Sequence, residues 1–387
     1  MITSAAPAAE TVTRRIWLEG VRVRDFRNLA SVDISPAREG MALVGENGHG
    51  KTNLLEALYY LQLFRSFRAA RDTELVRFGA RAFHVSATAH GASAAQVSVG
   101  FECAPGQRAG GRKRIRIDGS EPDTIADAVG VIPAVLFAPR DAAMIGGGPS
   151  ERRRFLDVML SLSSRPYLRT LQRYRAALVR RNIALREAQR GGDLDAVAAW
   201  EPALAEAGAA LYRDRAAWTL GAAKPFGWLC QRIGEHGSVE LRYESALAGS
   251  DDLEGALLAA LERRRSLHVR RGVTLDGPHR DDLALELDGR ELRTYGSAGQ
   301  HRTAAIALRL LEASTLRTAN DAEPLVLLDD PFAELDARRA GRILELLEDG
   351  ARGQTVLAVP RESEVPAHFT RLERFRVVEG AIQPAGI

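Results

Sequence analysis

Residues 45–52, GENGHGKT, combine the residue types and spacing needed to hold phosphate groups. In the pattern G-x-x-x-x-G-K-[ST], the glycines let backbone N–H groups turn inward around phosphate oxygens. Lys51 then reaches the β- and γ-phosphates, and the Thr52 hydroxyl ligates Mg²⁺. An apolar strand precedes the motif and a helix with leucines on one face follows it, as the motif requires. The sequence therefore predicts a site for ATP and Mg²⁺ in preference to a chance glycine turn.

An acidic pair far along the chain supplies the partner for this loop. In PLVLLDDP, residues 324–331, four apolar residues run without alternation, as expected of a parallel strand covered on both faces. Asp329 can hold Mg²⁺ directly or through water, and Asp330 can orient or deprotonate the attacking water. Alone, the pair could merely cap the strand, but the phosphate loop favours a catalytic role. Asp336 is a further nucleotide-binding candidate, with the N-cap of the next helix as its alternative role.

A second loop suited to phosphate begins at Tyr295, in YGSAGQHRTAAIALRLLE. Ser297, Gly299 and Gln300 form a small hydrogen-bonding cluster directly before an apolar helix. At a helix N-terminus the backbone N–H groups lack partners and the helix dipole favours an anion. Ser297 lies 252 residues after Gly45 (297 − 45), so the chain carries two separate loops that face phosphate.

The elements that must position these loops fall into three groups. Short strands are predicted at 16–26 and 31–35, and an antiparallel meander with an Asp-Gly turn at 84–119. From residue 151 to about 271 the composition shifts to Arg, Ala, Leu and Glu, which predicts an all-helical insertion. We expect a flexible tail at 1–14, ATPase lobes at 15–150 and 271–387, and the insertion at 151–270.

Length and composition bound the class of protein. A chain of 387 residues with 45% apolar content is long enough for two or three structural units. It contains no apolar run of roughly 20 residues, so no membrane span is expected. The first fourteen residues lack the apolar segment of a signal peptide. Cys103 and Cys230 have no metal-type spacing, which favours a reducing, cytoplasmic location.

Basic residues are clustered, although the net charge is only +3. Each cluster is explained well enough by a solvated face, but several in one chain make a polyanion such as DNA a plausible partner. The clusters are Arg65, Arg68 and Arg71; Arg112, Lys113, Arg114 and Arg116; Arg152, Arg153 and Arg154; and Arg263, Arg264 and Arg265 with Arg270 and Arg271.

The loop at Ser297 resembles the signature loop of the ABC-type ATPases. In that superfamily the loop does not touch the nucleotide bound by its own chain. It binds the γ-phosphate held on the P-loop of a second copy, so ATP lies between two subunits. The resemblance thus implies a homodimer that forms on ATP binding, with Ser297 acting in catalysis beside Lys51 and Asp330 of the other copy.

The resemblance narrows to one family, RecF, which is related to SMC heads. Its motifs occur in order: FRNL at Phe26, the P-loop, SFR at Ser66, PSERRRFLD from Pro149, GPHRDDL from Gly277 and DDPFAELD from Asp329. The match implies an α/β, ABC-type P-loop ATPase head in two lobes with an antiparallel β subdomain and an α-helical insertion. The nucleotide contacts that it implies come from Gly45, Glu46, Asn47, Gly48, His49, Gly50, Lys51, Thr52, Asn53, Ser297, Gly299, Gln300 and Asp336.

Function follows from the same resemblance. It implies weak, DNA-stimulated ATP hydrolysis and binding of single-stranded and duplex DNA at gaps and junctions. It also implies cooperation with RecO and RecR in placing RecA on strands coated by single-strand-binding protein.

The chain departs from the family pattern at three places. Ala333 replaces the usual serine, His49 fills a variable position, and the strand ending at Ala358 offers no clear switch residue. No Q-loop glutamine, DNA contact or RecR-binding surface can be assigned from the sequence. Without the family, GPHRDDL reads as a turn before a hairpin.

Three other classes compete with this interpretation. A transporter ATPase would place its signature after one compact helical subdomain, whereas an arginine-rich insertion intervenes here. A small-molecule kinase would need no signature, so Gly299 and Gln300 argue against it. A scaffold without activity would be expected to have lost Lys51 or the pair of aspartates.

Overall fold

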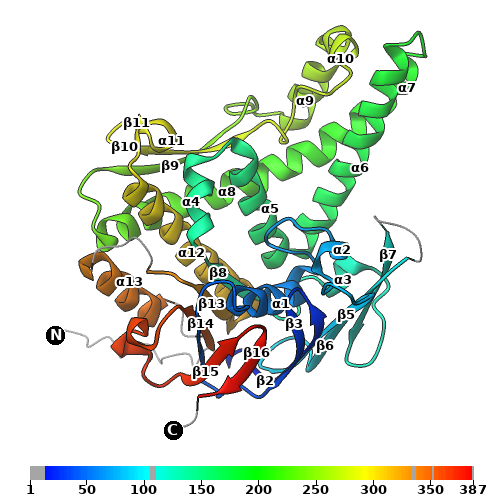
Figure 1. Cartoon of the computed structure of the whole chain (residues 1–387). Helices are drawn as coiled ribbons and strands as arrows, with labels where there is room; N and C mark the ends of the chain where they lie inside the picture. Colours follow the sequence, from blue (N-terminus) through cyan, green and yellow to red (C-terminus); the bar gives the residue numbers. More distant parts are fainter. Residues whose placement is uncertain (1–13, 105–109, 333–336, 351–352, 386–387) are drawn as a thin grey trace, which may run out of the picture.

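The centre of the protein is a six-stranded sheet (Figure 1). The computed structural model describes residues 14–104, 110–332, 337–350 and 353–385. All strands of this sheet except β16 run parallel to their neighbours. In spatial order they are β16 (Ala381–Pro384), β15 (Glu373–Val378), β4 (Gly40–Val44), β14 (Thr355–Val359), β13 (Leu325–Asp329) and β8 (Ala134–Phe137).

Both faces of this sheet are buried, which explains why β13 reads as an uninterrupted apolar run. Leu325 and Leu327 point into one hydrophobic core, whereas Val326 and Leu328 point into the other. A parallel strand covered on two sides needs apolar side chains at every position. The carboxyl ends of β4 and β13 therefore emerge from a rigid, closely packed layer.

One face is covered by α1 (Lys51–Leu63) and a five-stranded antiparallel sheet. Leucines on one side of α1 pack between the two sheets. This confirms the predicted meander and adds two earlier strands to it. The order is β3 (Leu29–Ile34), β2 (Trp17–Phe26), β5 (Ala82–His90), β6 (Gln96–Cys103) and β7 (Gly111–Ile117), with the short helices α2 (Asp72–Leu75) and α3 (Ile125–Ala128) nearby.

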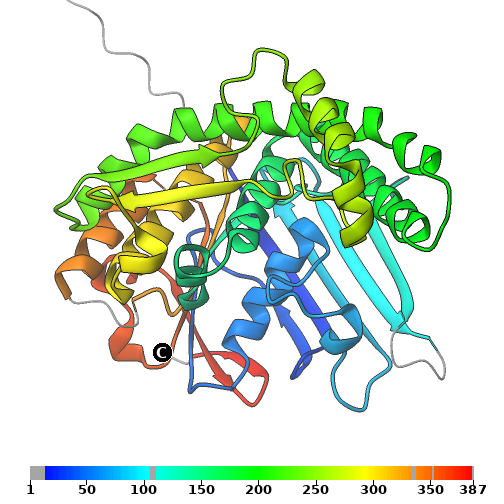
Figure 2. The same cartoon turned by 90° about the horizontal axis from the view of Figure 1, so that it is seen from above.

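The other face is covered by helices, among them the signature helix α12 (Ala298–Asn320). Helix α8 (Glu201–Ile233) lies across α12 and along β9 (Val239–Glu244) (Figure 2). The remaining helices are α4 (Ala142–Gly146), α5 (Pro149–Ser163), α6 (Arg165–Ala188), α7 (Asp195–Ala198), α8 (Glu201–Ile233), α9 (Leu253–Arg263), α10 (Arg265–Arg271), α11 (Leu292–Tyr295) and α13 (Ala337–Gly350), with 3₁₀ turns at Pro139–Asp141, Glu362–Glu364 and Ala367–Phe369.

The composition predicted an all-helical insertion, and this prediction is wrong because the insertion also contains a strand. Strand β9 (Val239–Glu244) pairs antiparallel with β10 (Asp282–Leu287), which also pairs with β11 (Arg290–Glu291). Leu241 and Leu285 are partners on the buried face of this small sheet. The sheet ties the insertion to the segment that leads into the signature loop, and residues far apart in sequence create it.

Two further observations concern the ends of elements. Arg14, expected in the tail, pairs in β1 (Arg14–Arg15) with β12 (Ala322–Glu323). Among the described residues, no helix has the length and apolar character needed to span a membrane. The division at residues 150 and 270 stays a prediction.

Candidate nucleotide-binding site

The P-loop joins β4 to α1, and its lysine is folded back over the loop. The Lys51 ammonium donates hydrogen bonds to the backbone carbonyls of Gly45 and Glu46, the second at 2.9 Å. Burial lowers the pKa of Lys51, while Asp329 and Asp330 act in the opposite direction. The ammonium therefore lies at the centre of the loop and within the electrostatic reach of the acidic pair.

The loop lies against a C-terminal hairpin that sequence reasoning did not single out. A Cβ at Gly45 would lie 2.2 Å from the Val377 carbonyl oxygen of β15, so only glycine fits there. The Gly380 N–H donates to the His49 carbonyl at 2.8 Å. The alternation in RFRVV followed by Glu-Gly was the available sequence signal for this hairpin.

Thr52 and Asp329, predicted as the metal ligands, are in direct contact. The Thr52 hydroxyl donates to an Asp329 carboxylate oxygen at 2.8 Å. Adjacent ligands of an octahedral Mg²⁺ with bonds of about 2.0–2.1 Å lie about 2.9 Å apart, so the two oxygens fit the ion. Burial raises the pKa of Asp329, and the hydrogen bond from Thr52 opposes that rise. A cation would hold the carboxylate ionised in this buried place.

Asp330 follows at the end of β13 in an uncommon backbone conformation. Its φ of 47° is in the left-handed region, which aspartate tolerates better than most residues. The Asp330 N–H donates to the Ala358 carbonyl at 3.0 Å, and its own carbonyl accepts from Arg302 at 3.3 Å. These backbone contacts hold the turn that sets Asp330 beside Asp329.

Glu56 organises the supports of the P-loop helix. It is fully buried and accepts two hydrogen bonds from Arg27, at 2.9 and 3.0 Å, and a third from the Ser66 hydroxyl. Arg68 lies 3.6 Å from the same carboxylate and donates to the Asn53 amide oxygen at 3.2 Å. The FRNL and SFR motifs thus brace α1, a role that the sequence analysis did not assign.

Asn53 was predicted to bind nucleotide, which stays a prediction, and its side chain closes a link beneath the loop. Its amide donates to Asn28 at 2.8 Å. Asn28 in turn packs so closely on Gly50, at φ 114°, that a Cβ there would lie 2.7 Å from the Asn28 side-chain oxygen. The two asparagines therefore shape the last turn of the P-loop.

The signature loop is set apart from the P-loop of its own chain. Ser297 is the N-cap of α12: its hydroxyl accepts from the Gln300 N–H at 3.3 Å, and the Gln300 side chain accepts from the Ser297 N–H at 2.8 Å. Within the described residues, no hydrogen bond or ion pair of 297–300 reaches residues 45–53. Ser297 is exposed and Gly299 is half-buried, so the loop faces outward.

Buried charges fix the signature helix. Arg309 of α12 forms ion pairs with Asp141 and Glu312, each at 2.7 Å. Beneath the loop, a His301 ring nitrogen lies 2.7 Å from the Leu292 carbonyl oxygen. Neither residue was singled out from the sequence.

GPHRDDL is more than a turn before a hairpin. Tyr174 and His279 are hydrogen-bonded at 2.6 Å, and burial lowers the pKa of His279 to about 4. Nearby, Arg215 donates to Asp157 at 2.7 Å and to the Pro278 carbonyl at 2.8 Å. The motif thus joins the helices of the insertion to the signature lobe.

The structure divides the basic clusters into structural and exposed residues. Arg152 is buried and forms a bidentate pair with Asp282, so this member of the RRR motif has a structural role and is not part of a solvated or DNA-binding face. Arg264 and Arg265 pair with Asp276 and Glu201. The exposed members that form no ion pair within the described residues are Arg65, Arg71, Arg112, Arg114, Arg116, Arg263, Arg270 and Arg271.

The other predicted residues lie at the tip of the P-loop or outside the described residues. Glu46, Asn47 and Gly48 are exposed at the tip of the P-loop. With His49, Glu46 and Asn47 line a pocket of about 720 Å³ that extends to Pro360 and Arg376. Ala333 and Asp336 fall outside the described residues. The described part of the chain contains no cluster of three metal-binding side chains.

The fold and site together define an ABC-type P-loop ATPase. The family described as RecF/RecN/SMC N terminal domain matches residues 17–380. The chain is 38% identical to the DNA replication and repair protein RecF of Salinibacter ruber, over 89% of this chain and 85% of that protein. It is 36% identical to RecF of Roseiflexus castenholzii, covering 96% and 100%. The chain therefore belongs to the RecF family.

A solved structure supports the same conclusion. The recombination mediator protein RecF-ATP in the RecFOR pathway superposes with a TM-score of 0.87 at 27% identity, covering 98% of this chain and all of that one. The predicted family and fold class are thus confirmed.

Proposed function

We propose that the protein is an ATP-dependent DNA-binding protein of recombinational repair and replication restart. It binds DNA at gaps and junctions as a dimer around ATP and helps RecO and RecR to load RecA. Family membership and the name of the RecF-ATP structure support ATP as the ligand. The observation that carries the proposal is the contact between Thr52 and Asp329, which unites the P-loop and the acidic strand.

Each residue has a defined task in this site. Backbone N–H groups of the P-loop bind the phosphates, and Lys51 moves from the loop carbonyls to the β- and γ-phosphates. Thr52 and Asp329 would hold Mg²⁺, which would neutralise charge on the phosphates. Asp330 orients the attacking water and accepts its proton.

The signature loop serves the other subunit. Because residues 297–300 form no hydrogen bond or ion pair with residues 45–53 within the described part of the chain, this loop does not supply a group at the γ-phosphate of its own site. A second copy supplies that group through Ser297 and the free N–H groups at the start of α12. Two such sites form in a twofold symmetric dimer.

Turnover of ATP tests the proposal directly. The rate per chain should rise with protein concentration until dimers saturate, and duplex or gapped DNA should increase it. Sedimentation with a non-hydrolysable ATP analogue should show dimers that are absent without nucleotide. A rate per chain that stays flat down to monomeric concentrations and ignores DNA would contradict the proposal.

A further inference from the structure

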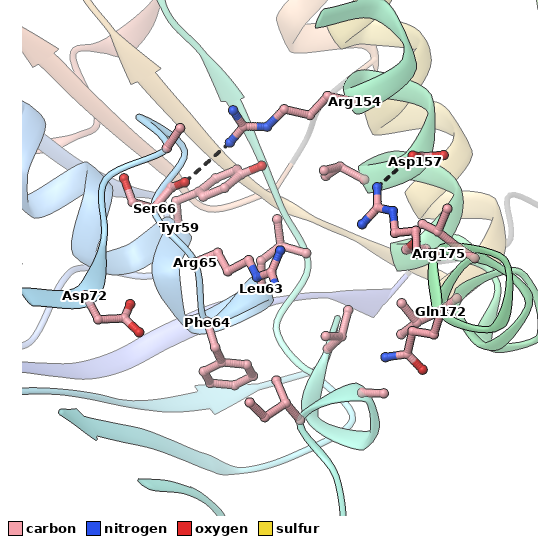
Figure 3. A pocket seen from close by; sticks show the side chains of 18 of the residues that line it. Tyr59, Leu63, Phe64, Arg65, Ser66, Asp72, Arg154, Asp157, Gln172 and Arg175 are labelled. Atoms are coloured by element: carbon pink, nitrogen blue, oxygen red, sulfur yellow. Dashed lines mark hydrogen bonds and ion pairs between the residues drawn. The ribbon is translucent and has the colours of Figure 1, made fainter. Parts of the chain in front are cut away.

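A large pocket lies between the ATPase lobe and the first helices of the insertion (Figure 3). Its volume is about 890 Å³, within the range of pockets that hold small ligands. One wall is the end of α1 and the segment that follows it, and the opposite wall is formed by α5 and α6. Leu63, Phe64 and Arg65 face Asp157, Gln172 and Arg175 across the pocket. None of these residues takes part in the nucleotide site.

The pocket has an excess of positive charge. Two of its cations are neutralised within the protein, since Lys113 pairs with Asp72 at 2.8 Å and Arg175 with Asp157 at 2.9 Å. The other three have no carboxylate partner among the described residues: Arg65, Arg71 and Arg154. Guanidinium groups in this state suit a phosphate, which accepts their hydrogen bonds in pairs.

A buried hydroxyl inside the pocket lacks a partner. Ser161 of α5 is 7% exposed, lines the pocket, and its Oγ forms no hydrogen bond. Leaving such a group unpaired costs about 1–3 kcal/mol. The Oγ atom is itself buried, so an occupant that offers it a polar atom recovers that cost only after the side chains over it shift.

Arg154 is held in place at the edge of the pocket. Its guanidinium lies 3.4 and 3.3 Å from the carbonyls of Ser66 and Phe67, at the long end of the hydrogen-bond range. These weak contacts orient the side chain without neutralising it. A phosphate can therefore bind Arg154 with little rearrangement.

The remaining lining is apolar with a few acceptors. Ile125, Val129 and Leu168 provide a surface for a flat ring, and Gln172 is exposed without a hydrogen-bond partner in the described structure. Carboxylates already present at Asp72 and Asp157 disfavour a ligand made only of acidic groups. A nucleotide carries both a phosphate and N–H donors on its base, and it satisfies both kinds of lining group.

We propose that this pocket binds one nucleotide unit of an unpaired DNA strand, with its phosphate at Arg65, Arg71 and Arg154 and its base near Ser161. The inference rests on the proposed function in DNA repair. It adds a site at which the protein distinguishes single-stranded DNA from duplex DNA. In a duplex the bases are stacked inside the helix, so only an unpaired nucleotide can enter.

Binding of a fluorescein-labelled (dC)₁₀ strand, with the non-hydrolysable ATP analogue present, tests the pocket. The double variant Arg65→Gln/Arg71→Gln should bind the strand about tenfold more weakly, and its log–log salt slope should fall by about 0.7, the value for one phosphate contact. The matched control is Arg186→Gln/Arg190→Gln, two exposed arginines near the far end of α6, which should keep the wild-type slope.

A second variant tests the contact with the base separately from the contact with the phosphate. Ser161→Leu fills the interior and should weaken (dC)₁₀ binding severalfold while leaving the salt slope and the affinity for a ten-base-pair duplex unchanged. Wild-type binding by both pocket variants would overturn the proposal. Displacement of the strand by hexa-aspartate would assign the pocket to acidic peptides and would overturn the proposal.

The outcome is separable from that of the proposed function. Both pocket variants should still form dimers with the ATP analogue, as measured by sedimentation. Failure of the pocket leaves those dimers intact, whereas failure of the proposed function removes them in the wild type.

Discussion

The P-loop and the signature loop both precede a helix, yet their surroundings differ. The P-loop is braced from its own chain: Asn28 packs on Gly50, Glu56 collects Arg27 and Ser66, and the C-terminal hairpin blocks any side chain at Gly45. The signature loop has its capping box and a helix anchored by Arg309, but within the described residues it forms no hydrogen bond or ion pair with the P-loop. The P-loop binds ATP within its own chain in the proposed site, so it needs support from that chain. The signature loop completes the partner's site in the proposed dimer, so it must face outward.

The largest expected effect comes from Lys51→Ala. Removing the ammonium deletes two charge-assisted contacts to phosphate, worth about 3–5 kcal/mol together, so ATP affinity should fall at least 100-fold. Titration with a fluorescent ATP analogue measures it. Lys224→Ala, at an exposed position on α8, is the control and should bind normally. Near-normal affinity of Lys51→Ala would place the phosphates elsewhere.

Ser297→Arg should damage the other loop alone. Its bulk obstructs the partner's phosphate but leaves Lys51 and Thr52 intact, so ATP should bind to monomers at wild-type affinity. Dimerisation on ATP should be lost, and hydrolysis should fall about 100-fold. Sedimentation beside equilibrium binding checks both halves. Ser35→Arg adds the same charge at an exposed site and should still dimerise; a dimer of Ser297→Arg would refute the two-subunit site.

Asp330→Asn should leave ATP binding by both loops unchanged and should slow only the chemical step. Loss of a general base costs about 10²–10⁴ in rate, so ATP should remain trapped in stable dimers. Because aspartate is one methylene shorter than glutamate, wild-type turnover should itself be slow. Asp329→Asn should by contrast weaken Mg²⁺-dependent ATP binding, because Asp329 is a proposed metal ligand. Normal hydrolysis by Asp330→Asn would show that another group is the base.

The smallest expected effect is on the stability of the fold and involves neither of the two loops. His279 belongs to neither loop, and burial lowers its pKa to about 4. The unfolded chain takes up a proton below about pH 6.5 while the native state stays neutral, so stability falls as the pH drops from 6.5 towards 4.

Between pH 7 and 5 this one residue should cost about 2 kcal/mol of the free energy of unfolding. Urea unfolding at both values measures the loss, and His279→Gln should reduce it by that amount. An equal pH dependence in wild type and variant would mean that His279 is protonated in the native state. ATP-induced dimerisation at pH 7 should be unchanged in this variant.

Local sequence was sufficient for the parts of the site that depend on spacing. GENGHGKT, the acidic end of β13 and the Ser297 loop were all recognisable, because each places several groups on one short segment. The brace at Glu56 was not, since its partners Arg27 and Ser66 come from separate segments. The β9 strand was missed for the same reason: an arginine- and alanine-rich composition favours helix, and only pairing with β10 overrides it.

The arginine clusters show most clearly which properties the sequence alone does not determine. The sequence by itself determined that arginines cluster, that two loops suit phosphate and that an acidic strand follows. Only the tertiary structure decided that Arg152 is neutralised by Asp282, 130 residues away, while Arg65 and Arg71 lie beside a pocket and form no ion pair within the described residues. The physical reason is that a charge's role depends on the distance to its counter-charge and on burial, and folding brings those together from distant parts of the chain.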